Sequence, residues 1–368
     1  MGILLNPDNI AFQQSLNSEI YVDKTELIVH TNRVLRTEQK FICISRPRRF
    51  GKSMAANMLT AYYSKGCDSR EMFSNYKIAQ IDSFEKHLNK YNAIHINMVK
   101  YLSEAKNVEE MIKFIEEDII DDITEDMPDL VMPRRANLTN VLNKAFIQFK
   151  VPFVFIIDEW DCIFRKNKDN TDSQTLYLDF LRNLLKDQSY VALAYMTGIL
   201  PIKKYGEHSA INVFYEYSMT NAQPISEFTG FTEDEVKSIC EKYNKNFDEM
   251  KRWYDGYCLD GLSIYNPKSV VESVLRNSYS NYWTSTETYE ALKEHIQRNF
   301  DGLKEKITQM IAGERVSVNT AKFQNDMTSL NSADDVLTLL VHLGYLTFMA
   351  TNETGSGEVW IPNSEVRQ

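Results

Sequence analysis

The sequence predicts an α/β fold whose parallel sheet is covered by helices on both faces. Apolar, β-branched stretches recur along the first part of the chain, and segments with helical spacing separate the first four of them. Strands that alternate with helices are typical of parallel sheets buried on both faces. The five predicted strands are Phe41–Ser45, Ala93–Met98, Phe153–Ile157, Val191–Met196 and Val213–Met219.

The helices between these strands are indicated by apolar side chains that return every three or four residues. This spacing is followed by Met54, Met58 and Tyr62, and by Met111, Ile115, Ile119 and Ile123. The acidic run 116–126, EEDIIDDITED, has the same period, because its acids alternate with isoleucines. We therefore interpret this run as the solvated face of a helix rather than as a metal-binding cluster.

The strand signal fades after Ser226, and helix signals replace it. Thr232 and Glu235 form a capping box for a helix that runs to about Tyr243. Asn266 and Pro267 are a good N-cap and first-turn pair for a second helix. We expect a helical lid here.

Helices near 288–299, 303–312 and 332–343 precede a final hairpin in YLTFMATNETGSGEVWIPN, which turns at its Gly-Ser-Gly. Helices followed by a two-stranded wing resemble a winged helix. The expected domains are an α/β core at 1–226, a helical lid at 227–285 and a winged-helix-like segment at 286–368.

Composition places the chain among intracellular globular proteins. Its 41 Lys and Arg against 51 Asp and Glu give a net charge of −10, which disfavours nucleic acid and anionic membranes as partners. Five scattered cysteines with no CxxC pair fit a reducing compartment. The longest apolar run, 151–157, is too short for a membrane span, and the N-terminus has no export signal. We expect a cytoplasmic protein with no membrane partner.

The stretch FICISRPRRFGKSMAANML reads as a strand, a basic loop and a helix. Its Gly51-Lys52-Ser53 is what a phosphate-binding loop needs: close backbone approach, a lysine for the β- and γ-phosphates, and a hydroxyl for Mg²⁺. Arg46 stands where such a loop normally has its first glycine, and Pro47 can hold that turn. The nucleotide-binding residues that we expect in the loop are Arg46, Pro47, Arg48, Arg49, Phe50, Gly51, Lys52, Ser53 and Met54.

Asp158 and Glu159 end a fully apolar predicted strand, at the edge of the sheet where ligands bind in such folds. We expect Asp158, with Ser53, to hold Mg²⁺, and Glu159 to polarise the attacking water as a general base. Lys52 joins Glu159 in the expected catalytic set.

Thr197 ends the next predicted strand, and we expect it to orient water. Lys203 or Lys204 can reach a γ-phosphate, or both lysines belong to a solvated loop. Arg48 and Arg49 have two interpretations: they neutralise charge that develops on the phosphates, or they form ion pairs that stiffen the loop.

Together these features resemble the AAA-ATPase-like family of bacterial and archaeal P-loop proteins. The resemblance covers nearly the whole chain and rests on YVDKTELI, SRPRRFGKSM, FIIDEWD, TGIL, GFTEDEV, WYDGY and YNP. It implies a P-loop NTPase sheet of order 2-3-4-1-5, a helical lid and a winged-helix-like segment. It also implies that Arg46 in place of glycine is the family's own pattern, and that Asp23 and Lys24 border the adenine.

The resemblance further implies that longer relatives carry a C-terminal domain similar to PD-(D/E)XK nucleases. Residues 1–368 contain no matching acid–acid–lysine constellation, so we expect no nuclease activity from them. WYDGY, at 253–257, is interpreted as a turn packed by aromatics, with a nucleotide-sensing role for Tyr254 or Asp255 as the alternative.

The leading hypothesis is an Mg²⁺-dependent ATPase that acts as a switch on a protein partner or a nuclease-like effector domain. Alternatives are a DNA-associated ATPase that positions a nuclease, and a nucleotide sensor without turnover. Residues 281–368 hold seven Lys and Arg and twelve Asp and Glu, a net charge of 7 − 12 = −5, which weakens the case for DNA. A kinase is disfavoured by Glu159 directly after Asp158. ATP is favoured over GTP because no guanine-reading Asn/Thr-Lys-x-Asp motif occurs.

Overall fold

The computed structural model describes residues 2–167, 170–202, 211–283, 296, 299–324, 330–351 and 355–368. The chain divides into two units. The first comprises Met1–Ile44, Lys52–Gly198 and Tyr205–Glu216, and the second comprises Ser45–Gly51, Ile199–Lys204 and Tyr217–Gln368. The predicted phosphate loop therefore groups with the second unit up to Gly51, whereas Lys52 begins the next segment of the first unit.

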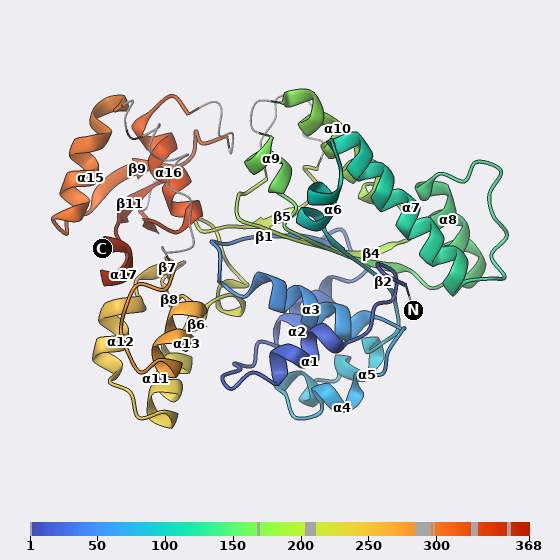
Figure 1. Cartoon of the computed structure of the whole chain (residues 1–368), viewed down its shortest axis with the longest axis horizontal. Coiled ribbons are helices and arrows are strands. Elements are labelled where there is room, and N and C mark those ends of the chain that lie inside the picture. Colours follow the sequence, from blue (N-terminus) through green and yellow to red (C-terminus); the bar gives the residue numbers. More distant parts are fainter. Residues whose placement is uncertain are drawn as a thin grey trace. The chain divides into compact units, whose positions relative to one another are not determined.

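The first unit is built on a five-stranded sheet of order β2-β3-β4-β1-β5 (Figure 1). Its strands are β1 (Phe41–Ser45), β2 (Asn92–Asn97), β3 (Phe153–Asp158), β4 (Val191–Gly198) and β5 (Tyr215–Tyr217). β2 pairs with β3 and β3 with β4 in parallel. The predicted α/β class and the order 2-3-4-1-5 are confirmed.

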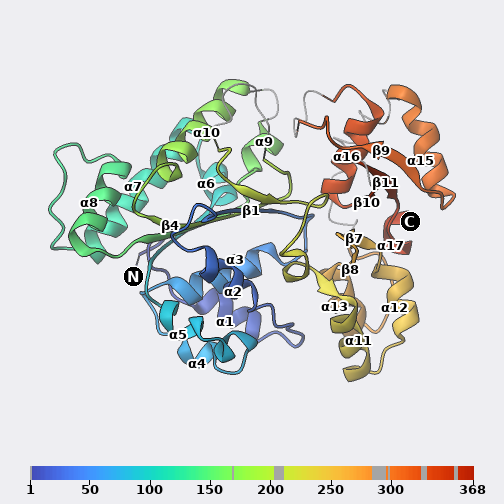
Figure 2. The same ribbon diagram turned by 180° about the vertical axis from the view of Figure 1, so that it is seen from behind.

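Helices cover both faces of this sheet, as Figures 1 and 2 show. One face carries α1 (Ile10–Leu16), α2 (Leu27–Val34), α3 (Lys52–Tyr63), α4 (Arg70–Phe73), the short η1 (Lys77–Gln80) and α5 (Ser83–His87). The other carries α6 (Met98–Glu104), α7 (Val108–Asp126), α8 (Leu138–Phe149), α9 (Cys162–Lys166) and α10 (Thr171–Leu185). Because both faces are covered, every residue of β3 and β4 is buried, which explains their continuous apolar sequences.

The acidic run lies on α7, which buries Met111, Ile115 and Ile119 on one side as its spacing predicts. One acid of the run has a structural role. The carboxylate of Asp122 is buried and accepts the backbone N–H groups of Ile3, Leu4 and Leu5 at 2.9, 2.6 and 2.9 Å. Asp122 therefore fixes the start of the chain onto the first unit.

The second unit contains two three-stranded sheets, of order β6-β8-β7 and β10-β11-β9. Its strands are β6 (Phe231–Thr232), β7 (Tyr257–Leu259), β8 (Leu262–Tyr265), β9 (Val316–Asn319), β10 (Thr347–Ala350) and β11 (Ser356–Trp360). The pairs within both sheets are antiparallel. The sequence predicted only the last hairpin, because strands of two to four residues are too short to show an alternating pattern.

The described helices of the second unit are η2 (Ser226–Phe228), α11 (Glu233–Lys242), α12 (Phe247–Tyr254), α13 (Pro267–Leu275), η4 (Phe300–Gly302), α15 (Leu303–Ile311), α16 (Ala333–Leu343) and α17 (Ser364–Arg367). Two of them, α11 and α13, begin where their capping residues predict. Thr232 and Glu235 form the predicted capping box of α11, and Asn266 caps α13 with Pro267 in its first turn. Most of the helix predicted at 288–299 lies outside the described residues. The boundaries of a lid and a winged-helix-like segment remain predictions.

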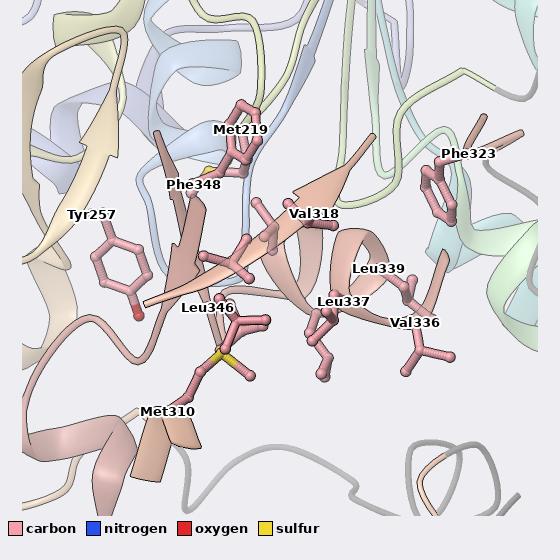
Figure 3. Close-up of a cluster of buried hydrophobic side chains, with 14 of the residues drawn as sticks. Met219, Tyr257, Met310, Val318, Phe323, Val336, Leu337, Leu339, Leu346 and Phe348 are labelled. Atoms are coloured by element: carbon pink, nitrogen blue, oxygen red, sulfur yellow. The ribbon is translucent and has the colours of Figure 1, made fainter. Parts of the chain in front are cut away.

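A buried apolar cluster joins the two sheets of the second unit. It contains Val318 of β9, Leu337 of α16 and Phe348 of β10, together with Tyr257 of β7. Figure 3 shows these side chains gathered with Met219, which comes from the segment after β5. Phe50, from the predicted phosphate loop, is fully buried in the same cluster. The loop is thus part of the hydrophobic core of the second unit.

No helix among the described residues is long and apolar enough to cross a membrane.

Candidate functional site

The predicted phosphate loop leads directly into a helix. β1 ends at Ser45, and α3 begins at Lys52. Within the loop Arg49 and Gly51 have φ of 70° and 85°, the left-handed region that glycine adopts without strain. No described atom lies within 4 Å of the point where a Cβ would stand on Gly51. The loop thus continues directly into a helix N-terminus through a left-handed glycine, the connection that phosphate binding uses.

Arg46 is held by the second unit. Its side chain is fully buried, and its Nε donates to Thr229 Oγ1 at 3.0 Å. Its Nη1 donates to the carbonyls of Ser45 and Tyr217, both at 2.9 Å. Its guanidinium lies inside the second unit, and a contribution of Arg46 to nucleotide binding remains a prediction. These hydrogen bonds anchor the start of the loop.

The remaining predicted loop residues differ in exposure. Phe50 is buried against Tyr257, with ring centroids 5.1 Å apart, whereas Arg49 and Ser53 are exposed. Met54 is 41% exposed, so it is not a core residue of α3. Lys203 and Lys204 lie outside the described residues.

In the first unit, Lys52 lies among carboxylates. Lys52 is 4% exposed, and burial lowers the pKa of its ammonium, while the charges of Glu159, Asp158 and Asp161 oppose this shift. The fold explains the grouping, because Asp158 ends β3, Glu159 follows it directly, and α3, which begins at Lys52, packs against β3. The predicted lysine and two predicted acids are thus brought together.

Thr197, near the end of β4, joins this group. Its buried hydroxyl donates to Asp158 Oδ1, and the same oxygen accepts the backbone N–H of Glu159 at 3.1 Å. We expected Thr197 to orient water. In this structure its partner is the Asp158 carboxylate, which it holds at the end of the strand.

Glu159 has a left-handed backbone, with φ of 57°. Such strain in a non-glycine residue costs about 1–3 kcal/mol and occurs often at functional sites. Its carboxylate forms an ion pair with Arg165 of α9. Arg165 also binds the fully buried Asp161, with Nε 3.0 Å from Oδ2.

Neither Arg165 nor Asp161 was predicted from the sequence. Their separation of four residues on a helix is the signal that indicates such a pair. That Arg165 also pairs with Glu159 can be seen only in the folded structure. A second missed group is His95 of β2, whose Nδ1 lies 3.0 Å from Thr60 Oγ1 of α3. Burial lowers the pKa of His95, and the charge of Asp158 opposes the shift.

Asp23, which we expect at the adenine, accepts two backbone hydrogen bonds in this structure. Its Oδ1 accepts the N–H of Thr25 at 2.8 Å, and its Oδ2 accepts the N–H of Lys77 at 3.0 Å. Asp23 thus connects the segment before α2 to η1. Lys24 is half-buried beside it, and a contact of either residue with a nucleotide remains a prediction.

The WYDGY motif is packed within the second unit. Tyr254 is buried, and its hydroxyl donates to the carbonyl of Ser280 at 2.9 Å. A Cβ on Gly256 would lie 2.1 Å from the carbonyl oxygen of Pro362, and Asp255 accepts a hydrogen bond from Ser263. These contacts favour the structural interpretation of the motif.

Comparison with known proteins identifies one curated relative and several solved structures of low similarity. An uncharacterised protein of the vnfD 5′ region of Azotobacter chroococcum mcd 1 is 24% identical over 359 residues, 94% of this chain; the chain spans 64% of that relative's length. Among solved structures, the Aeropyrum pernix ORC2 protein is 11% identical, with a TM-score of 0.37 over 98% of this chain and 94% of its own. AMPPCP-bound DnaA from Aquifex aeolicus is 10% identical, with a TM-score of 0.30 over 80% and 70%. Scores this low support no argument about this chain.

The match to a family model is more informative. The model described as "Predicted AAA-ATPase" matches residues 12–206, more than half of the chain. The matched range includes β1 to β4, the loop and the Lys52–Asp158–Glu159–Thr197 group. This chain therefore belongs to the predicted AAA-ATPase family.

Proposed function

We propose that this chain binds ATP with Mg²⁺ where the loop meets α3 and hydrolyses it as a molecular switch. One observation carries the proposal: Lys52 at the start of α3 lies with Asp158, Glu159 and Thr197 at the carboxyl ends of β3 and β4. A cationic side chain at a helix N-terminus beside strand-end carboxylates is the arrangement that binds a nucleotide triphosphate with its metal. Family membership supports the same conclusion.

The residues present fit a metal-bound triphosphate. Three carboxylates, those of Asp158, Glu159 and Asp161, outnumber the two cations Lys52 and Arg165, so a divalent cation is favoured there by charge. Ser53 is exposed in the first turn of α3, and its hydroxyl is a suitable oxygen ligand. When bound, Mg²⁺ would supply positive charge to the phosphate oxygens.

Each side chain has a distinct task in this proposal. Lys52 binds the β- and γ-phosphates as a point charge. Asp158 would hold the metal, and the Thr197 hydroxyl fixes the orientation of that carboxylate. Glu159 accepts the proton of the attacking water. The ion pair with Arg165 positions the Glu159 carboxylate before it accepts that proton.

We further propose that hydrolysis acts on a partner or an effector domain. The chain spans 64% of the length of its longer relative, which leaves room in that protein for a further domain. In this proposal the second unit passes a conformational change caused by hydrolysis to the effector domain. DNA association is the weaker alternative, because residues 281–368 carry a net charge of −5.

Phosphate release from ATP tests the proposal. We expect slow Mg²⁺-dependent turnover by the wild type and a loss of at least about 100-fold in Glu159→Gln, since a general base contributes about 10²–10⁴-fold. Glu117→Gln, which alters an exposed ion pair with Lys113 on α7, is the matched control and should keep full activity. Full turnover by Glu159→Gln would refute the assigned base. Stimulation by duplex DNA would favour the DNA-associated alternative, and ATP binding without turnover would favour a sensor.

A further inference from the structure

The predicted phosphate loop is held at three points by the second unit. Arg46 anchors its start through Thr229, as described above. Near its end, the carbonyl of Phe50 accepts the N–H of Gly230 at 2.9 Å. In its middle, the carbonyl of Arg48 accepts the indole N–H of Trp283 at 3.2 Å.

A hydrogen bond that fixes a backbone carbonyl also fixes the direction of the N–H of the following residue. A trans peptide is planar, so its N–H points away from its C=O. The bond from Trp283 to the Arg48 carbonyl therefore directs the N–H of Arg49 to the opposite side, and the bond from Gly230 does the same for the N–H of Gly51. Arg49 and Gly51 are the two left-handed residues of the loop. Successive N–H groups in such turns form concave anion sites, so these are amides that a phosphate would meet.

Trp283 is itself rigidly placed. It is fully buried, and its backbone N–H donates to Glu365 Oε1 at 2.9 Å. Its ring packs against Tyr345 with centroids 5.2 Å apart. Gly344 lets it approach the loop, because a Cβ there would lie 3.0 Å from Trp283 Cζ2 and 2.8 Å from Pro47 Cβ.

Glu365 of α17 completes the support. Its Oε1 also accepts the N–H of Tyr282 at 2.8 Å and the hydroxyl of Ser269 at 2.9 Å. Glu365 is 1% exposed, so these bonds form away from water, where they restrict motion most. A continuous set of hydrogen bonds therefore runs from the last helix, through Trp283, to the Arg48 carbonyl.

We propose that Trp283 is a positioning residue, which holds the phosphate loop in its nucleotide-binding conformation through the Arg48 carbonyl. This inference rests on the proposed function. Arg49 occupies a left-handed conformation that a non-glycine residue adopts at a cost, and without the indole N–H the peptide between Arg48 and Arg49 can rotate out of it. Nucleotide binding would then have to reorder the loop each time.

Trp283→Phe tests this directly, because phenylalanine keeps an aromatic ring and removes the N–H. We expect ATP affinity and KM to worsen about fivefold to tenfold, the effect of one hydrogen bond, with kcat nearly unchanged. Hydrogen exchange in the peptide 46–53 of the nucleotide-free protein should also become faster. The matched control is Trp253→Phe on α12, since the indole nitrogen of Trp253 has no hydrogen-bond partner among the described residues.

The outcomes separate this inference from the proposed function. If the wild type does not bind ATP, the proposed function fails. If the wild type binds and Trp283→Phe matches Trp253→Phe in affinity and in loop exchange, only the role of Trp283 is refuted. Should Trp283→Phe fail to fold, the indole N–H signals of the four tryptophans in the wild type give the same test. The Trp283 signal should shift on addition of ATP, and an unchanged signal would overturn the proposal.

Discussion

Arg165 forms ion pairs with two carboxylates of the first unit, and we predict that Arg165→Met destabilises this unit by about 3–5 kcal/mol, the usual cost of leaving a buried charge unpaired. Methionine preserves much of the apolar stem, so the change mainly removes charge. The side chain of Arg165 is 16% exposed, and its partner Asp161 is fully buried. Glu159 is 23% exposed, so water can solvate its carboxylate when the ion pair is broken. Its loss of Arg165 therefore contributes less to the destabilisation than that of Asp161.

The distance supports this magnitude. At 3.0 Å between Arg165 Nε and Asp161 Oδ2, an effective dielectric constant of about 20 gives an attraction of about 5–6 kcal/mol. Removing only the cation leaves the carboxylate desolvated without that attraction. Arg182→Met is the matched control: its Nη2 lies 3.0 Å from Asp179, but both side chains are more than 40% exposed, so we expect a loss below about 1 kcal/mol.

Urea denaturation followed by circular dichroism measures these losses, and hydrogen exchange of β3 assigns the transition to the first unit. A double-mutant cycle with Asp161→Asn isolates the pair. In the Asp161→Asn background, Arg165→Met should cost at least about 2 kcal/mol less than in the wild type. A loss below about 1 kcal/mol in the single variant, or equal losses in both backgrounds, would refute the reasoning.

Three further predictions concern other parts of the chain. Thr197→Val should weaken Mg²⁺-dependent ATP binding about tenfold, because the charged Asp158 carboxylate loses the hydrogen bond from the Thr197 hydroxyl. Unchanged affinity in calorimetric titrations with Mg²⁺ would contradict this prediction. Phe50→Ala should destabilise the second unit by about 3–5 kcal/mol, while Met54→Ala should stay within about 0.5 kcal/mol; similar urea midpoints for the two would contradict the core assignment of the loop. Burial and a neighbouring guanidinium lower the pKa of His342 to about 3, so the unfolded chain binds the extra proton as pH falls from about 6.5. The second unit should therefore lose about 2 kcal/mol between pH 7 and pH 5, and His342→Gln should remove this loss; an equal pH dependence in both proteins would contradict it.

The sequence was sufficient for the parts of the fold that depend on local pattern. The apolar run of β3 predicts a strand buried on both faces, and that is its position in the sheet. The capping box of Thr232 and Glu235 predicts the start of α11 to the residue. The sheet order came from the family resemblance rather than from periodicity, because strand order depends on contacts between distant segments.

The environment of the loop could not be predicted in this way. Arg46 and Thr229 are 183 residues apart in the chain, and Trp283 and Arg48 are 235 apart. No local pattern relates residues at such separations. A basic loop also suggests phosphate contacts for all of its arginines, whereas the Nε and Nη1 of Arg46 form hydrogen bonds inside the second unit. Its burial explains physically why an arginine can replace the usual glycine: its side chain holds the turn from within.

The central claim is that the loop ending in Lys52 is a nucleotide site, and calorimetric titration of ATP with Mg²⁺ tests it most directly. We predict binding by the wild type and an affinity at least about tenfold lower in Lys52→Ala, which removes the buried cation beside Asp158 and Glu159. Lys113→Ala, on the exposed face of α7, should bind like the wild type. No binding by the wild type, or equal affinity in Lys52→Ala, would contradict the claim.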